Sequence, residues 1–418
     1  MVITRQGIVS TSQALASQAG AQVLARGGSA IDAAIAANAV LGVTEPQMNG
    51  IGGDLFVLYW DAKTGKLTGL NSSGWAPQGL SIEFLKKNQH KQMPRTGIHS
   101  ATAPGCVEGW EKLHRRFGRL PWKDLFESAI YYAQQGFPVT EVIAGTWGAT
   151  RNKDAPEFAA ERRVFFPNGR APRVGEVFRN PDLAGAYERI AAGGADAFYR
   201  GPIAEAILKT SRRLGGTLAA GDLAKFSAEW VEPISTNYRG WTVYELPPNG
   251  QGMAALQMLN ILSQFEPEAP QSAEDLHRKI EAMKLAYADL RRYVADPRFA
   301  SVPTAGLLSM PYAAQRARLI DPDSARCTVG AGTPIVSGDT TYLAVVDREG
   351  NIASWIQSVS AIFGSGVVVD AMGFHLHNRG GGFSLDPKHP NALAPRKRPF
   401  HTIIPAFLEK GNLHIGFG

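Results

Sequence analysis

A pair of threonines at the boundary between a polar loop and an apolar run could supply a nucleophile. Ser337-Gly338-Asp339 precedes Thr340-Thr341, and the β-branched and aromatic run 342–346 follows. A hydroxyl nucleophile needs a base, and an N-terminal threonine has one in its own α-amino group, whose pKa lies near about 8. Cleavage before Thr340 would therefore put nucleophile and base on one residue. A threonine at the start of a strand is also common for structural reasons alone, because β-branched residues suit strands.

Other residue patterns point less clearly to chemistry. His375 and His377 alternate and would share one face of a strand, but no nearby set of carboxylates or cysteines completes a metal site. No Gly-x-Ser-x-Gly elbow is present, which disfavours an α/β-hydrolase. The loop 50–53, Gly-Ile-Gly-Gly, lacks the strand-turn-helix context of a dinucleotide site, so we interpret it as a place of close backbone approach. Gly380-Gly381-Gly382 could be a floor beneath a substrate or only a flexible turn.

The elements that must position these residues change in character along the chain. Residues 11–43 are predicted to form two alanine-rich helices, capped by Ser10 or Thr11 and broken at 26–29. A glycine-rich loop then leads into a hairpin of strands 55–60 and 67–70. Further helices are expected within 104–132, at 253–264 and at 272–293, and a strand at 242–246. Beyond the loop-like stretch 321–339 the chain is predicted to form short strands, at 341–346, 352–359, 366–369, 373–376 and 402–408.

Composition limits the class of protein. The 418 residues are 44% hydrophobic and 19% charged, which is typical of a globular chain with a large core. The net charge of +6 is scattered, with no basic arm, so we expect no nucleic-acid partner, and a mild positive potential suits a small anionic substrate. Cys106 and Cys327 are expected as free buried thiols rather than a long-range bridge. No signal peptide and no run of about 18 apolar residues is found, so the sequence predicts a cytoplasmic protein without a membrane partner.

Short blocks along nearly the whole chain occur in the order of a known family. They read Gly27-Gly28-Ser29-Ala30-Ile31-Asp32-Ala33-Ala34, Glu45-Pro46, Gly50-Ile51-Gly52-Gly53, Pro104-Gly105, Gly136-Phe137-Pro138-Val139, Phe198-Tyr199-Arg200-Gly201, Asp222-Leu223, Pro247-Pro248, Glu281-Ala282, Asp296-Pro297, Asp339-Thr340-Thr341, Val345-Val346-Asp347, Gly350-Asn351, Phe363-Gly364 and Arg398-Pro399. In these blocks the chain resembles the γ-glutamyltransferase family, the autoprocessing N-terminal-nucleophile hydrolases.

The resemblance implies an α+β fold, a four-layer αββα sandwich, and a precursor that cuts itself between Asp339 and Thr340. Residues 1–339 would form the large fragment and 340–418 the start of the small one, as one structural unit. Thr340 would attack an amide carbonyl, form an acyl-enzyme and release it to water or to an acceptor amine. Ser358 stands where the family has a hydroxyl that supports the nucleophile. No metal or organic cofactor is implied.

The family's substrate-binding positions have changed together. Ser73 replaces the arginine that binds the α-carboxylate of a γ-glutamyl group, and Gly382, next to Gly381, replaces the aspartate that pairs with its α-ammonium group. Ser360 replaces an asparagine, and His401-Thr402 replace a pair of serines. Loss of a buried charge partner typically costs about 2–5 kcal/mol. We therefore expect a ligand without a zwitterionic head group.

Arg379 adds a charge that this site usually lacks. It could form a surface salt bridge, or it could clamp a carboxylate through its bidentate guanidinium group. The clamp makes a small acidic amide a coherent substrate, as in the branch of the family that includes oxamate amidohydrolases. A γ-glutamyl substrate such as glutathione, a larger acyl group, and a non-catalytic binding protein on the same fold stay open as alternatives.

The resemblance also bears on assembly and on the end of the chain. The large fragment's partner would be its own small fragment, and a dimer of such heterodimers is compatible with the family. Family members continue beyond Gly418, where a glycine pair supplies the oxyanion hole, so the small fragment is expected to be C-terminally incomplete here.

Overall fold

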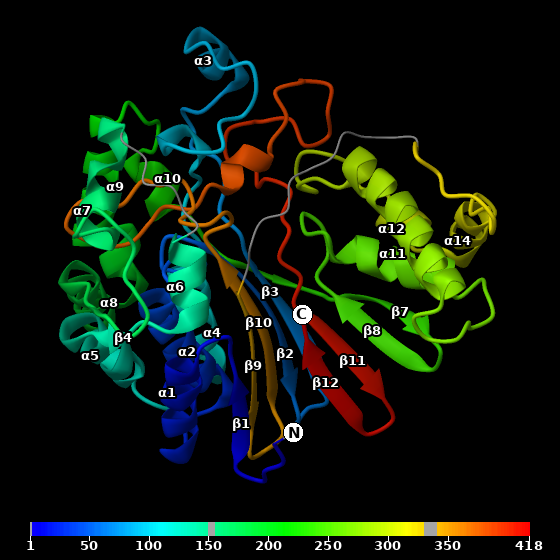
Figure 1. Ribbon diagram of the computed structural model, residues 1–418, viewed down its shortest axis with the longest axis horizontal. Helices are drawn as coiled ribbons and strands as arrows, with labels where there is room; N and C mark the ends of the chain where they lie inside the picture. Colours follow the sequence, from blue (N-terminus) through cyan, green and yellow to red (C-terminus); the bar gives the residue numbers. More distant parts are fainter. Residues whose placement is uncertain (1, 149–154, 330–340) are drawn as a thin grey trace.

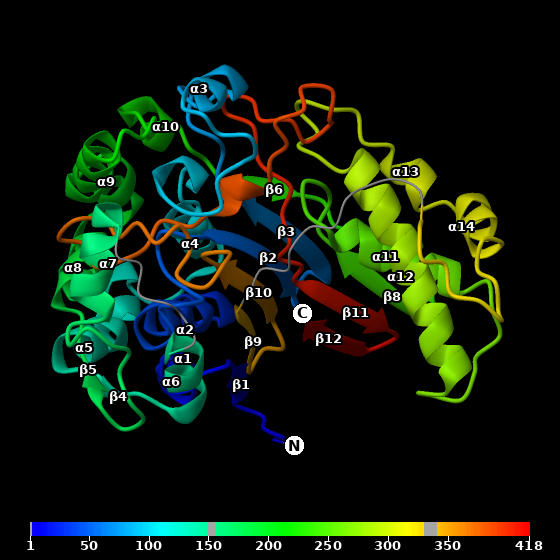
Figure 2. The same ribbon diagram turned by 45° about the horizontal axis from the view of Figure 1, so that its top comes forward.

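The computed structural model describes residues 2–148, 155–329 and 341–418, and these form four layers. Two β-sheets lie face to face in the middle, one helical layer covers the outer face of the larger sheet, and a second covers the outer face of the smaller sheet (Figures 1 and 2). This is the αββα sandwich that the resemblance predicts.

The larger sheet interleaves strands from the two ends of the chain. Within the described residues its order is β1 (Gly7–Ser10), β9 (Thr341–Asp347), β10 (Ile352–Ser358), β2 (Asp54–Asp61), β3 (Lys66–Ser72) and β6 (Glu229–Val231), and every neighbouring pair is antiparallel. The strands that follow the threonine pair therefore lie between β1 and β2, in the interior of the sheet.

The smaller sheet has the order β12 (Leu413–Phe417), β11 (Ala406–Lys410), β8 (Trp241–Glu245) and β7 (Ile234–Tyr238). Side chains alternate along β2, so Leu55 and Val57 face the helices while Phe56 and Leu58 face the smaller sheet. Phe407 of β11 packs with Phe56 and Leu58 in the core between the sheets. By the same alternation, Asp54 points between the two sheets.

The helical layer on the larger sheet is built around one fully buried helix. Ser29 and Asp32 form a capping box at the start of α2 (Ala30–Thr44), and every residue of this helix is buried. Its alanines allow α1 (Ala14–Ala25) to pack closely against it. The other elements of this half are α3 (Ile82–Lys87), α4 (Cys106–Phe117), α5 (Glu127–Gln135), β4 (Phe137–Pro138), α6 (Glu141–Gly148), α7 (Ala159–Phe165), β5 (Val177–Phe178), α8 (Pro181–Tyr199), α9 (Pro202–Arg213) and α10 (Ala220–Ala224).

The second helical layer contains α11 (Gly252–Leu262), α12 (Ala273–Tyr293), α13 (Thr304–Leu307) and α14 (Met310–Ala317). Helix α11 packs on β7 and β8. None of the helices in the described parts of the chain is long and apolar enough to cross a membrane.

The predicted helices and the first hairpin are confirmed within a few residues, but several local predictions are wrong. Segments 366–369 and 373–376 are not strands; a tight turn between them leaves one bridge, Val368 to His375. The strand predicted at 402–408 is displaced to β11, because residues 401–405 run irregularly past the site described below. Gln13, rather than Ser10 or Thr11, caps α1, since Ser10 ends β1. Cys106 is buried as expected, but the prediction that Cys327 is buried is wrong: it is exposed in a polar segment.

Candidate active site

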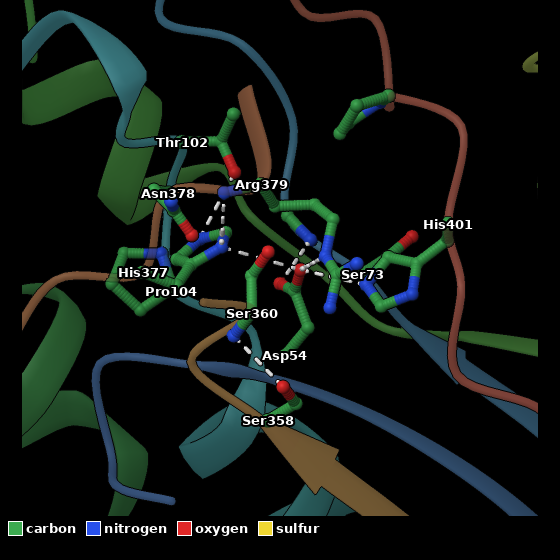
Figure 3. Close-up of polar contacts among 12 residues, drawn as sticks. Asp54, Ser73, Thr102, Pro104, Ser358, Ser360, His377, Asn378, Arg379 and His401 are labelled. Atoms are coloured by element: carbon green, nitrogen blue, oxygen red, sulfur yellow. Dashed lines mark hydrogen bonds and ion pairs between the residues drawn. The ribbon is translucent and has the colours of Figure 1, made fainter. Parts of the chain in front are cut away.

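The carboxylate of Asp54 is the centre of a buried polar cluster between the two sheets (Figure 3). Asp54 is the first residue of β2 and pairs in register with Ser358, the last residue of β10. Gly53, just before it, must be glycine, because a Cβ there would lie 2.3 Å from the carbonyl oxygen of Ser358. One carboxylate oxygen of Asp54 accepts a hydrogen bond from the Gly74 amide at 2.8 Å, and the other accepts one from His401 Nε2 at 2.8 Å.

Two buried histidines flank this carboxylate. His377 Nδ1 lies 3.4 Å from Asp54 Oδ2, and its Nε2 is 3.0 Å from the hydroxyl of Thr102. Burial lowers the pKa of His377, and burial together with the charge of Arg379 lowers the pKa of His401 to about 3. Burial alone would raise the pKa of Asp54, but His377, His401 and Arg379 outweigh it and lower that pKa to about 2. The site at neutral pH therefore holds an anionic Asp54 and two neutral histidines.

Arg379 is a buried cation with unused hydrogen-bonding capacity. It begins the short 3₁₀ helix η4 (Arg379–Gly382), and only 4% of its surface is exposed. Its Nη1 donates to the hydroxyl of Thr402 at 2.6 Å, and its Nε lies 3.9 Å from Asp54 Oδ2. Within the described residues, Nε and Nη2 have no hydrogen-bond partner. Burial lowers the pKa of Arg379 to about 10, so the side chain keeps its charge at neutral pH. The alternative of a surface salt bridge is thereby excluded.

The two predicted serines, Ser358 at the end of β10 and Ser360 just after it, lie beside this cluster (Figure 3). The amide of Ser360 donates to Ser358 Oγ at 2.8 Å, and Ser360 has a positive φ of 83°, so the chain turns sharply at the end of the strand. Asn378 fixes the same turn by accepting from the amide of Ala361 at 3.0 Å. The structure thus brings Ser358 and Ser360 to the side of Asp54.

Ser73 is also in this region, but its polar groups are engaged by the protein. Its amide and hydroxyl both donate to Asn71 Oδ1, at 3.0 and 2.8 Å, and its hydroxyl accepts from Asn249 at 3.2 Å. Its carbonyl oxygen accepts from Arg398 Nε at 3.0 Å. Its predicted role in binding substrate stays a prediction.

The glycine triplet has a mixed role. Gly380 is required by close approach, because a Cβ there would lie 2.7 Å from the carbonyl oxygen of Ser100. A Cβ on Gly381 would lie 3.1 Å from the carbonyl oxygen of Pro94, while one on Gly382 would meet only the carbonyl oxygen of Phe400, at 3.4 Å. The triplet therefore forms a 3₁₀ turn in which close approach requires glycine at 380, and its predicted role in binding substrate stays a prediction.

Asp339 and Thr340, the predicted cleavage site and nucleophile, lie outside the described residues. The next residue, Thr341, starts β9, pairs with Gln357 and donates from its hydroxyl to Glu45 Oε2 at 3.1 Å. Ser358 follows Gln357 at the end of β10. The chain therefore enters β9 beside the cluster around Asp54.

Sequence reasoning missed the residue at the centre of the site. The sequence analysis interprets only the preceding loop, 50–53, although an acidic residue at the first position of an apolar strand, Asp54 in Asp-Leu-Phe-Val-Leu, is itself a signal of a special environment. Thr102, the partner of His377, had no sequence signal. His375 and His377 were predicted to share a face, but His375 packs against Phe165 and lies near Glu161, away from Asp54.

The arrangement combines a buried, partly unpartnered guanidinium group, a fixed carboxylate and two hydroxyl-bearing residues at one strand end. Such a guanidinium group can bind a carboxylate through two parallel N–H bonds. Among the described residues there is no group of three or more histidine, cysteine, aspartate or glutamate side chains with a geometry fit for a metal ion.

The chain is similar to proteins of one family along almost its whole length. The family model described as Gamma-glutamyltranspeptidase matches residues 16–418. The chain is 38% identical to the glutathione hydrolase-like YwrD proenzyme of Bacillus subtilis, over 98% of this chain and 77% of that protein. It is 37% identical to the oxamate amidohydrolase proenzyme of Klebsiella pneumoniae, over 97% of this chain and 76% of that protein. The solved structure of cephalosporin acylase from Bacillus halodurans is 45% identical, with a TM-score of 0.93 over 99% of this chain and 77% of that one.

Proposed function

Because the chain belongs to the gamma-glutamyltranspeptidase family and is an amidohydrolase of the N-terminal-nucleophile type, we propose that it cuts itself before Thr340 and then hydrolyses the amide of a small acid that carries a free carboxylate. Residues 1–339 and the fragment that begins at Thr340 would stay together as a heterodimer. The interleaving of β9 and β10 between β1 and β2 supports this, because separation would break the larger sheet.

In the proposed reaction the hydroxyl of Thr340 attacks the amide carbonyl. The α-amino group of Thr340 takes the hydroxyl proton and passes it to the nitrogen of the leaving amine, so an ester to Thr340 forms as the C–N bond breaks. Water then attacks this ester, and the acid leaves as Thr340 regains its proton. We assign Ser358 the supporting hydroxyl.

The proposed substrate class rests on the guanidinium group of Arg379, which is buried and only partly hydrogen-bonded within the described residues. A buried N–H group without a partner costs about 1–3 kcal/mol. Arg379 has two such atoms, Nε and Nη2, within the described residues. A substrate carboxylate would supply two oxygens to this edge and recover that cost. Thr402, which accepts from Nη1, orients the guanidinium group for it.

A γ-glutamyl head group fits this site less well, although similarity to a glutathione hydrolase-like proenzyme keeps it as the second candidate. Its α-ammonium group needs an anionic partner, and the predicted position for one is Gly382. Asp54 is a buried carboxylate in this cluster, but His401, His377, Arg379 and the Gly74 amide already surround it. An acid amide without an ammonium group, such as oxamate, needs only a cationic partner for its carboxylate, and Arg379 supplies one.

Intact-mass measurement of the denatured protein tests the first step. Wild-type protein should give two fragments, the second beginning at Thr340, and Thr340→Ala should remain one chain and hydrolyse neither oxamate nor γ-glutamyl-4-nitroanilide. Thr341→Ser is the matched control: it keeps the hydroxyl that donates to Glu45 and should be cleaved. Normal cleavage of Thr340→Ala would refute the proposal. Faster hydrolysis of the γ-glutamyl amide than of oxamate would favour the second candidate.

A further inference from the structure

A pocket of about 550 Å³ adjoins η4 at its last residue, Gly382. This volume is typical of pockets that hold a small organic molecule. Its walls come from three parts of the chain: the end of α3 with the segment after it, the C-terminal end of α12 with the residues that follow it, and the segment 382–391 together with Phe400.

The pocket has an apolar interior and a basic rim. Met93, Leu290, Val294, Phe383 and Phe400 line it and are each less than a tenth exposed. The charged residues that line it are Lys86, Lys91, Arg291 and Asp386, so cations exceed anions. An apolar group would fit the interior, and the rim disfavours a cationic ligand.

Gly382 lines this pocket and ends the 3₁₀ helix that Arg379 begins. The two residues are the ends of η4, and a 3₁₀ helix rises about 2 Å per residue, which separates them by about 6 Å along its axis. Gly382 has no left-handed backbone conformation, and a Cβ on it would make only an ordinary van der Waals contact with Phe400. Neither conformation nor packing requires glycine here, so a larger residue would be tolerated at this point of the pocket wall.

The order of groups in space decides which part of a substrate reaches the pocket. Ser358 pairs with Asp54, Asp54 contacts Arg379, and Arg379 is joined through η4 to Gly382 and the pocket. In the proposed function the carboxylate at Arg379 belongs to the acyl part of the substrate. The acyl part, and not the leaving amine, is therefore the part that Arg379 holds next to the pocket wall at Gly382.

We infer that this pocket binds an apolar branch on the acyl part of the substrate, so that the enzyme prefers a monoamide of an aryl- or alkyl-branched dicarboxylic acid. This inference rests on the proposed function, because it assumes that the free carboxylate lies at Arg379. It extends that function by giving the acyl part a second contact, which oxamate lacks.

Calorimetric titration of the purified protein with two free acids, glutarate and 3-phenylglutarate, tests the inference without turnover. Both acids supply a carboxylate, and they differ only in the ring. Burial of a phenyl ring predicts that 3-phenylglutarate binds about tenfold to a hundredfold more tightly. Equal affinities would overturn the inference, and so would failure of both acids to bind.

Variants of Gly382, in the pocket wall, locate the ring. Gly382→Ala, and Gly382→Val as a larger block, should reduce the ratio of the affinity for 3-phenylglutarate to that for glutarate about tenfold. Gly306→Ala in α13 is the control, because a Cβ there meets nothing within 4 Å. A preference that survives both Gly382 variants would place the ring elsewhere and overturn the inference.

Hydrolysis of the mono-4-nitroanilides of the two acids distinguishes a wrong pocket assignment from a wrong proposed function. If both monoamides are hydrolysed at similar kcat/KM, the pocket assignment fails and the proposed function stands. If the chain stays uncut and neither monoamide is hydrolysed, the proposed function itself fails.

Discussion

Replacement of Arg379 by methionine should remove the preference for acidic amides while sparing neutral ones. The guanidinium group is buried, and its Nε and Nη2 are available to a ligand. Truncating one partner of a buried, hydrogen-bonded charge pair costs about 2–5 kcal/mol, which corresponds to roughly thirtyfold to several thousandfold in kcat/KM. Methionine has a similar length and fills most of the space, so the loss should reflect charge and hydrogen bonds rather than a cavity.

The assay compares two substrates of nearly equal shape. N-(4-nitrophenyl)oxamate carries a carboxylate, and N-(4-nitrophenyl)oxamide carries a carboxamide in its place; both release 4-nitroaniline, which absorbs visible light. For Arg379→Met, kcat/KM for the oxamate should fall at least thirtyfold, and kcat/KM for the oxamide should change by less than about threefold. Intact mass must first establish that the variant is cleaved to the same extent as the wild type.

Two further variants separate charge from geometry. Arg379→Lys keeps the charge but loses the planar fork of the guanidinium group. Its kcat/KM for the oxamate should therefore lie between those of the wild type and Arg379→Met. Thr402→Val removes the acceptor for Nη1 of Arg379. It should lower kcat/KM for the oxamate by a smaller factor than Arg379→Met does. An equal fall for the oxamate and the oxamide in Arg379→Met would refute the reasoning, because Arg379 would then serve only to hold Asp54.

Two predictions concern the stability of the buried cluster. Asp54→Asn weakens the contacts with His401 and Arg379 and should lower the free energy of unfolding, measured by denaturant titration, by about 3–5 kcal/mol. The control Asp61→Asn, at the other end of β2, should lower it by less than about 1 kcal/mol. Equal losses in the two variants would contradict the central role of Asp54. The folded-state pKa of His401 is about 3, below the ordinary value of 6.5, so the unfolded chain binds more protons between these values and stability falls as the pH drops through this window. From pH 7 to pH 5 this should remove about 2 kcal/mol, seen as a lower melting temperature that His401→Gln makes less pH-dependent; an unchanged slope in that variant would assign the effect to other groups.

Local patterns predicted most of the elements because they depend on near neighbours. The apolar alternation in 55–60 and the turn after it are sufficient to indicate β2 and β3, and the break at 26–29 separates α1 from α2. The same local rules failed at 366–369 and 373–376, where apolar residues are buried in a tight turn packed on the core rather than in a sheet. Alternation reports burial on one side, and only hydrogen-bond partners decide whether a segment is a strand.

The candidate active site also has features that the sequence predicts and features that only the structure shows. The blocks around Thr340 and the substitutions at Ser73, Gly382 and His401 were readable in the sequence, and so was the presence of an additional arginine. The role of Arg379 was not, because a guanidinium group in a surface pair and one buried with two free N–H groups have the same sequence. Burial against Asp54 and Thr402 decided between them.

The sequence by itself determined the family blocks, the threonine pair and the chemistry that these residues can perform, because such features depend on residue type and order along the chain. Only the tertiary structure decided which polar and charged side chains meet. Asp54 and His401 are 347 residues apart in sequence and 2.8 Å apart in space. Their contact arises from the packing of two sheets whose strands come from both ends of the chain, and that packing has no local signature.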